Sequence, residues 1–257
     1  MLQWIARGLG KGRITTAYPR REETPPAGFR GRIELLHASN ASGELEALCP
    51  TGAIKVDGQQ RLSVDRGRCI LCGACVLAAP ERFAFTAGYE TAARTRSALV
   101  VPEDRDAPLG PLRETLAEQA RALRRSVHVR HIDCGSDGSD EWEIQALWNP
   151  YYDIQRLGFF LTNAPRHADV LLVTGPVTRA MREPLERTWD VMPEPKALIA
   201  VGSDACSGGL SDAGELTAGG VDAVLPVDVY VPGSPPSPIA IMHGLRLATG
   251  LLQAVAA

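Results

Sequence analysis

Four cysteines constrain the fold of this 257-residue chain more than any other feature of its sequence. Three of them, Cys69, Cys72 and Cys75, stand at C-x2-C-x2-C spacing, and Cys49 precedes a proline earlier in the chain. In cubane iron–sulfur sites, a triplet of this spacing supplies three thiolates and a Cys-Pro elsewhere supplies the fourth. We therefore predict that these four residues ligate one [4Fe–4S] cluster. A zinc site built from the same thiols is the alternative, although the triplet and the distant Cys-Pro favour iron–sulfur.

The pattern that holds this cluster is present a second time without its cysteines. Extending the C-x2-C-x2-C-x3-C spacing around both runs reaches four positions at which a second cluster would take its ligands. These positions are occupied by Ser39, Ser42, Leu45 and Ala79. A hairpin predicted over 53–64 and a strand predicted over 83–85 fall at corresponding places after the two runs, which indicates an internally duplicated fold. Residues 30–101 are therefore predicted to form a ferredoxin-like α+β domain that retains one cluster.

The composition is that of a globular protein and excludes several functions. Hydrophobic residues make up 45% of the chain and the net charge is −3, which indicates no nucleic-acid partner. Six cysteines are too few for a disulfide framework, and four are assigned to the cluster, so we expect a reducing, cytoplasmic environment. No apolar run approaches about 18 residues, so no membrane-spanning helix is predicted. The sequence also lacks a nucleophile triad, a P-loop and a GxGxxG fingerprint.

Three flanking segments are predicted to connect or dock rather than to carry chemistry. Residues 1–13 place apolar side chains at helical spacing among basic ones. This predicts an amphipathic helix that lies on a membrane surface or a partner, or packs on its own domain or another subunit. The rest of 1–29 is a proline-stiffened arm, and 102–125 is a charged, proline-rich linker followed by a helix. Residues 239–257 are predicted to form an amphipathic helix that packs on a core.

From residue 126 onward the predicted elements alternate between strand and helix. Strands are predicted over 127–132, 168–174, 196–201 and 223–228. Helices are predicted over 141–147 (with Ser139 or Asp140 as the N-cap), over 178–189, and from about residue 238. Apolar strands separated by helices indicate an open, doubly wound (flavodoxin-like) parallel sheet over 126–257. In such sheets, ligands bind beyond the carboxyl ends of the strands.

Motifs along both parts of the chain carry a family resemblance. In the second part they are the segments 126–130, 149–153, 165–178, 193–196 and 227–233. Together they resemble the small subunit of membrane-bound (group 4) nickel–iron hydrogenases and the homologous twenty-kilodalton subunit of respiratory complex I. In the first part, 15–19 and 29–31 together with the two cluster-binding runs resemble the ferredoxin subunit of formate hydrogenlyase-type complexes. The chain is thus similar to a fusion of two neighbouring electron-transfer subunits.

The resemblance implies a second kind of cluster site in 126–257, and the sequence departs from it. Members of the family hold a proximal [4Fe–4S] cluster that passes electrons to a large catalytic subunit. The positions of its four ligands are occupied in this chain by Asp137, Asp140, Asp204 and Ser234. Because iron–sulfur clusters are held by thiolates, we expect no proximal cluster in this chain.

Three interpretations of the replacing aspartates stay open at this point. They fill a hydrated void while capping a helix and pairing with arginines, or they share protons at raised pKa values, or they bind Mg2+ or Ca2+. The neighbouring Cys134 and Cys206 are predicted to be buried structural thiols, with a shifted metal site as the alternative.

Two functional hypotheses follow. The first is a non-catalytic electron-transfer subunit of a complex I-like or group 4 hydrogenase-related oxidoreductase, with its one cluster in 30–101. The second is a redox-inactive scaffold that couples a large subunit to a membrane arm that moves protons or ions. The implied partners are a hydrogenase large subunit, or a subunit like the forty-nine-kilodalton subunit of complex I, and antiporter-like membrane subunits. The chain is then expected on the cytoplasmic face of the membrane.

Overall fold

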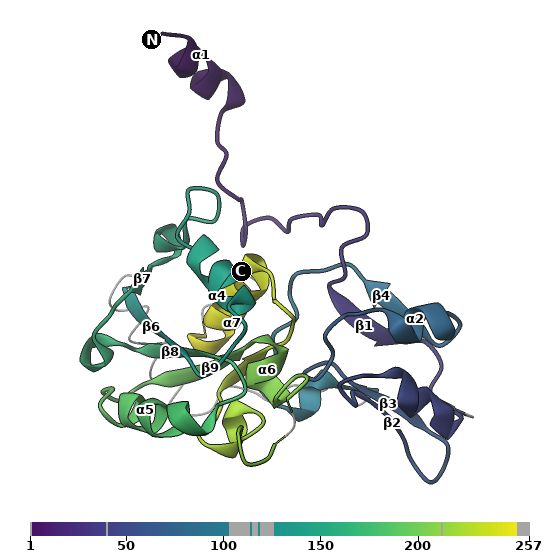
Figure 1. Cartoon of the computed structure of the whole chain (residues 1–257). Helices are drawn as coiled ribbons and strands as arrows, with labels where there is room; N and C mark the ends of the chain where they lie inside the picture. Colours follow the sequence, from purple (N-terminus) through teal and green to yellow (C-terminus); the bar gives the residue numbers. More distant parts are fainter. Residues whose placement is uncertain are drawn as a thin grey trace.

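The computed structural model describes residues 2–39, 41–102, 114, 118, 126–211 and 213–250. Most of the linker and helix predicted over 102–125, and the end of the predicted C-terminal helix at 251–257, lie outside these residues. Figure 1 shows two folded units side by side, with helix α1 (Leu2–Lys11) extending away from both. The helix predicted over 1–13 is therefore confirmed. Among the described residues, no helix combines the length and the apolar character that crossing a membrane requires.

The first unit is built from short antiparallel strands. Its elements are β1 (Arg32–Leu35), the 3-10 helix η1 (Gly43–Leu48), β2 (Ile54–Val56), β3 (Leu62–Asp65), α2 (Ala74–Ala78), β4 (Phe83–Thr86), the 3-10 helix η2 (Ser97–Leu99) and β5 (Val100–Val101). β1 pairs with β4, and β3 lies between β2 and β5. The predicted hairpin is β2–β3 and the predicted strand at 83–85 is β4, so both predictions are confirmed.

The second unit is, within the described residues, a five-stranded parallel sheet between two layers of helices (Figure 1). Its strands are β6 (Val127–Asp133), β7 (Phe159–Leu161), β8 (Val170–Thr174), β9 (Ala197–Val201) and β10 (Val229–Val231). Its helices are α4 (Ser139–Ala146), α5 (Arg179–Asp190), α6 (Gly202–Ser207) and α7 (Pro238–Ala248), with 3-10 helices η3 (Ile154–Leu157), η4 (Pro165–His167) and η5 (Val221–Ala223). The strands lie in the order β10-β9-β8-β6-β7, and all neighbours are parallel. This is the doubly wound, flavodoxin-like order that the sequence predicts.

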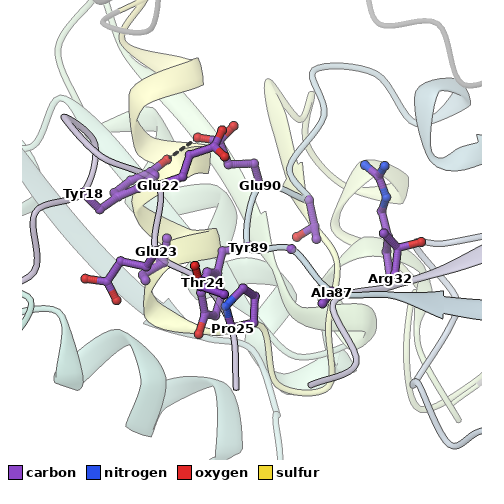
Figure 2. A pocket seen from close by; sticks show the side chains of 13 residues that line it. Tyr18, Glu22, Glu23, Thr24, Pro25, Arg32, Ala87, Tyr89 and Glu90 are labelled. Carbon is purple, nitrogen blue, oxygen red and sulfur yellow. Dashed lines mark hydrogen bonds between the residues drawn. The ribbon is translucent and has the colours of Figure 1, made fainter. Parts of the chain in front are cut away.

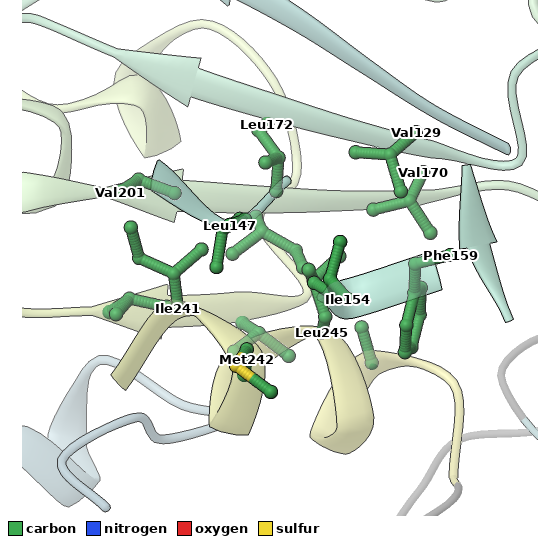
Figure 3. Close-up of a cluster of buried hydrophobic side chains, with 14 of the residues drawn as sticks. Val129, Leu147, Ile154, Phe159, Val170, Leu172, Val201, Ile241, Met242 and Leu245 are labelled. Carbon is green, nitrogen blue, oxygen red and sulfur yellow. The ribbon is translucent and has the colours of Figure 1, made fainter. Parts of the chain in front are cut away.

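The central strands separate two layers of apolar core. Val170 and Leu172 of β8 face the layer that contains α4 and α7, as Figure 3 shows. Leu171 and Val173 face the opposite layer, which contains α5 and α6. Every residue of β8 and β9 is buried, as expected for central strands of a parallel sheet that is covered on both faces.

The strand predicted over 223–228 is wrong. The stretch starts at the end of η5, and β10 begins only at Val229. Pro226 has no N–H to give to a sheet. Asp228 instead makes two hydrogen bonds to the backbone of Leu198 in β9. Its N–H donates to the Leu198 carbonyl oxygen at 2.9 Å, and its carboxylate accepts from the Leu198 N–H at 2.8 Å. The short strand β7 has no counterpart among the predicted elements.

The helix predicted over 141–147 begins two residues earlier, and neither predicted N-cap is correct. The N-cap of α4 is Gly138, which has a φ of 90°. The Asp137 carboxylate accepts from the Ser139 N–H at 2.9 Å and so satisfies a donor of the first turn. Asp140 consequently turns into the protein instead of capping the helix.

The C-terminal helix is buried rather than amphipathic. Every residue of α7 is buried, including His243 and Arg246. The helix packs on β9 and β10. The Ala92 N–H approaches His243 Nδ1 at 3.3 Å, and the Arg246 guanidinium lies 5.6 Å from the centre of the Tyr18 ring. The N-terminal arm and the end of the first unit thus cover the polar side chains that the sequence pattern assigns to solvent.

Arg96 joins the two units. Its guanidinium donates to both carboxylate oxygens of Asp65, at 2.6 and 2.5 Å, in the first unit. Its Nε donates to the Cys206 carbonyl oxygen in α6, at 3.1 Å, in the second unit. The side chains of Arg96 and Asp65 are 26% and 19% exposed, so the ion pair is largely shielded from water.

We expect Arg96→Met to lower the free energy of unfolding by about 2–4 kcal/mol, because it leaves a shielded carboxylate without its partner. Urea unfolding followed by tryptophan fluorescence measures the loss. The matched control is Arg32→Met, which removes an exposed ion pair to Glu34 and should cost less than about 1 kcal/mol. Equal losses in the two variants would contradict a joining role for Arg96.

Candidate metal centre and carboxylate pocket

The four predicted cluster ligands line one cavity in the first unit. Cys49 follows η1, Cys69 and Cys72 lie on the loop that leads into α2, and Cys75 lies in the first turn of α2. The apolar part of the wall comes from Ile33, Ile54, Val64 and Phe85. The four thiols that the spacing singles out therefore line one cavity, although within the described residues no three of them form a group that could hold a metal ion as they stand.

Backbone N–H groups and one arginine hold the cysteine loops in shape. The Ala53 N–H donates to Cys49 Sγ at 3.2 Å, and the Leu71 N–H donates to Cys69 Sγ at 3.4 Å. Leu71 has a φ of 56°, and Arg30 donates to its carbonyl oxygen at 2.8 Å. Hydrogen bonds to sulfur favour the thiolate form and tune a bound cluster.

The donor set fits a group that carries positive charge. Burial, together with the charges of the other three thiols, raises the pKa of the Cys69 thiol to about 12. Burial also raises the pKa of Cys75. Four thiolates in this cavity therefore need a cationic partner, and the iron atoms of a cluster, or a zinc ion, supply that charge.

The positions of the missing second cluster in the first unit serve packing and capping. Ala79 is buried, and Leu45 packs against the same apolar core. Ser42 is the N-cap of η1, and its hydroxyl accepts from the Glu44 N–H at 3.3 Å. These side chains complete the core of the unit where a symmetric module would place further ligands.

The four residues that the family resemblance places at cluster-ligand positions follow the carboxyl ends of parallel strands. Asp137 and Asp140 follow β6 at the start of α4, Asp204 follows β9 in α6, and Ser234 follows β10. This is the edge of the sheet at which the sequence predicts a site. Asp140 is buried and Asp204 half-buried, whereas Ser234 is exposed.

The three aspartates differ in the direction in which their pKa is shifted. Burial raises the pKa of Asp140 to about 8, and the charges of Glu141, Asp204 and Asp137 act in the same direction. Burial also raises the pKa of Asp204, followed by the charges of Asp137 and Glu141. Asp137 has a lowered pKa, because it accepts hydrogen bonds from the hydroxyl and N–H of Ser139 at 2.6 and 2.9 Å. The raised pKa values of Asp140 and Asp204 accord with the interpretation in which these carboxyls hold protons.

Helix α6 contacts both the cysteine cavity and the group of acidic residues Asp137, Asp140, Glu141 and Asp204, which we call the carboxylate pocket. The Ser203 hydroxyl donates to the Cys69 carbonyl oxygen at 3.0 Å, and the Ser207 hydroxyl donates to the Gly67 carbonyl oxygen at 3.1 Å. At the start of the same helix, a Cβ placed on Gly202 would lie 2.2 Å from Asp140 Oδ2. The two candidate sites are therefore neighbours across one short helix.

Comparison with known proteins accounts for both parts of the chain. Residues 137–248 match the family described as NADH ubiquinone oxidoreductase, 20 Kd subunit, and residues 62–122 match the 4Fe-4S single cluster domain. The probable membrane-bound hydrogenase subunit mbhJ of Pyrococcus furiosus is 41% identical over 137 residues, which are 53% of this chain and 82% of that protein. The chain belongs to this NADH ubiquinone oxidoreductase subunit family. The family resemblance identified in the sequence is thereby confirmed.

Other similar proteins of known sequence or structure cover the chain in part. Formate hydrogenlyase subunit 7 of Escherichia coli is 40% identical over 160 residues, which are 62% of this chain and 62% of that protein. The chain thus spans less than two thirds of that family member. A chain in the solved structure of the membrane-bound sulfane sulfur reductase, an archaeal respiratory membrane complex, is 28% identical with a TM-score of 0.45. The similarity covers 54% of this chain and 75% of that one.

Further polar residues lie beside the aspartates, at positions that the family resemblance does not single out as ligands. Glu141, beside Asp140, accepts from the Ser136 hydroxyl at 2.6 Å and from the Thr174 hydroxyl. The Thr174 oxygen lies 3.1 Å from His131 Nε2, and burial lowers the pKa of that histidine. His131 and Thr174 lie near the carboxyl ends of β6 and β8, where ligands of such sheets bind. This position is the signal in the sequence by which they could have been found.

Cys134 and Cys206 are buried in the apolar core, as predicted for structural thiols. The Cys206 thiol lies 3.7 Å from the Ala200 carbonyl oxygen, and burial raises the pKa of Cys134 to about 12. Across the part of the chain that the structure describes, no three His, Cys, Asp or Glu side chains form a group that could hold a metal ion.

A cavity of about 310 Å³ lies elsewhere, where the N-terminal arm meets the segment after β4. Figure 2 shows Tyr18, Glu22, Glu23, Tyr89 and Glu90 around it, with the Tyr18 hydroxyl donating to Glu90 at 2.9 Å. The predicted cluster ligands and the aspartates do not line this cavity.

Proposed function

We propose that this chain is an iron–sulfur electron-transfer subunit of a membrane-associated oxidoreductase related to complex I and group 4 hydrogenases. In this proposal, one [4Fe–4S] cluster is held by Cys49, Cys69, Cys72 and Cys75. The single cavity lined by these four thiols carries the proposal. The match to a single-cluster 4Fe-4S domain favours iron–sulfur over zinc. The names of two relatives, a formate hydrogenlyase subunit and a probable membrane-bound hydrogenase subunit, support a place in such a complex.

The residues around the cavity have separate tasks in this function. A bound cluster supplies one-electron transfer. The four cysteines hold it, and the N–H groups of Ala53 and Leu71 stabilise sulfur charge. Cys72 is exposed, so one edge of the site is at the protein surface, where a redox partner approaches.

We further propose that the carboxylate pocket holds no cluster, so that the electron path does not continue through the second unit. Its four ligand positions carry oxygen groups, whereas iron–sulfur clusters depend on thiolates. The Asp140 and Asp204 carboxyls already fill space beside α6, because a Cβ on Gly202 or Gly209 would lie 2.2 or 1.8 Å from them.

The second unit then serves as a scaffold. It docks a large subunit, of the hydrogenase type or like the forty-nine-kilodalton subunit of complex I, onto antiporter-like membrane subunits, with the chain peripheral on the cytoplasmic face. The family membership of this unit supports the role. It is compatible with electron transfer in the first unit, because the two roles fall on different halves of the chain.

Anaerobically purified protein is expected to contain about four iron atoms per chain and to give one cubane signal by electron paramagnetic resonance after reduction. Cys72→Ala is expected to remove most of the iron and the signal, because it deletes one of four ligands. Since Cys72 is exposed, this truncation removes no packing from the core. Iron and acid-labile sulfide analysis, with the spectrum, measures the loss.

Cys134→Ala is the matched control, because this thiol is buried in the other unit and lies outside the cavity. It should leave the iron content unchanged. Iron that persists in Cys72→Ala would contradict the ligand assignment, and stoichiometric zinc would contradict the iron–sulfur assignment. About eight iron atoms per chain would contradict the empty carboxylate pocket.

A further inference from the structure

The carboxylate pocket encloses an acid that lacks the contacts of a buried anion. Asp140 is 4% exposed, and its Oδ1 has no hydrogen-bond partner among the residues that the structure describes. Its other oxygen lies against the start of α6, where a Cβ on Gly202 would be 2.2 Å away. The carboxyl is therefore held between α4 and α6. A buried carboxylate without hydrogen bonds is strongly disfavoured against its neutral form.

The titratable groups that face Asp140 make the anion still less favourable. They are Asp137 and Glu141 on its own segment, Asp133 at the end of β6, and Asp204 and Cys206 on α6. Glu141 is engaged by hydroxyl donors and lies 3.6 Å from His131 Nε2. Burial keeps the pKa of His131 low, so it adds little positive charge at neutral pH. Each neighbour is thus an acid, or a neutral group that does not compensate a second negative charge.

We propose that this pocket is a proton-binding site, in which Asp140 holds a proton at neutral pH and exchanges it with water through Asp204. Asp204 is half-buried, it follows β9 at the same edge of the sheet, and its charge acts on Asp140, so it offers a partly solvent-exposed acid for this exchange. The proton comes from water and returns to water, and only O–H bonds form and break. The proposal goes beyond the electron-transfer function and does not depend on whether a cluster is bound.

Infrared spectroscopy of the full-length protein with 13C-labelled aspartate, between pH 5 and pH 10, tests the proposal. At pH 7 we expect the C=O stretch of a protonated aspartic acid, which disappears with a midpoint near pH 8. Asp140→Asn should lack this band. The control Asp137→Asn should retain it, because Asp137 is hydrogen-bonded and ionised.

Asp204→Asn provides a second, independent test if Asp140→Asn folds poorly. It should keep the band but lower its midpoint, because a neighbouring negative charge is removed, and it should slow the isotope shift after transfer to D2O. A wild-type protein without the band at pH 7 would overturn the proposal, as would a band that survives in Asp140→Asn. A band that vanishes on addition of Mg2+ or Ca2+ at pH 7 would assign the pocket to a cation instead. Iron content measured in the same samples tests the cluster separately.

Discussion

Asp140→Asn is expected to raise the free energy of unfolding by about 5 kcal/mol at pH 8 and to change it little near pH 4. The folded state keeps the Asp140 proton up to about pH 8, whereas an unfolded chain releases it near pH 4. The stability that this proton contributes is therefore fully present below about pH 4 and is lost as the pH rises to about 8. Asparagine keeps the size of the side chain and has no proton to lose.

Urea unfolding of wild type and variant at several pH values, at equal iron content, measures this difference. Asp137→Asn is the control, because that carboxylate is exposed and has a lowered pKa. It should keep the wild-type loss of stability with rising pH, reduced only as far as the Asp137 charge contributes to the raised pKa of Asp140. If Asp140→Asn lost stability with rising pH as steeply as the wild type, the acid responsible would lie elsewhere.

Gly202→Ala is expected to destabilise the protein by about 2–5 kcal/mol. Two effects add: the residue has a φ of 90°, which costs an L-residue about 1–2 kcal/mol, and the new Cβ would lie 2.2 Å from Asp140 Oδ2. Overpacking of this kind costs about a further 1–3 kcal/mol. Because Asp140 is buried between two helices, its carboxyl cannot swing aside into water.

Gly138→Ala separates the two effects, since Gly138 has the same φ of 90° with nothing within 4 Å of its added Cβ. It should lose only about 1–2 kcal/mol. In an Asp140→Ala background the collision is absent, so Gly202→Ala should then cost about as little as Gly138→Ala. Equal costs for Gly202→Ala with and without the aspartate would show that the carboxyl does not rest against α6. Urea unfolding of the four variants measures the cycle.

Cysteine spacing and strand alternation made most of the architecture predictable. The triplet beginning at Cys69 and the distant Cys49 meet at one cavity, because each lies on a short loop beside the same small core. The buried strands β8 and β9 are continuous apolar runs in the sequence. Such runs are expected where helices cover both faces of a sheet. The edge at which the aspartates gather follows from the parallel order alone.

The errors arise where contacts from distant segments override a local pattern. His243 and Arg246 suggest a solvent-facing side for α7, but the arm and the end of the first unit cover it. The N-cap of α4 is a glycine with positive φ, and this conformation frees Asp140 to turn inward. The apolar run before β10 contains Pro226, so the strand starts later, after Asp228 has bonded to Leu198 of the neighbouring strand β9. The contacts that cover α7 and the pairing of Asp228 with Leu198 are distant in sequence, whereas the N-cap of α4 depends on the local conformation of Gly138.

The N-terminal arm belongs to both units. The Thr16 N–H donates to the Tyr151 carbonyl oxygen at 2.8 Å, and Tyr18 is buried in the core of the second unit. At the other end of the first unit, Ala93 and Tyr230 exchange backbone hydrogen bonds at 2.9 and 2.8 Å. A proteolytic nick within 103–125 would therefore leave two fragments that stay associated. The covalent connection would then fix a one-to-one stoichiometry of the two units rather than create their interface.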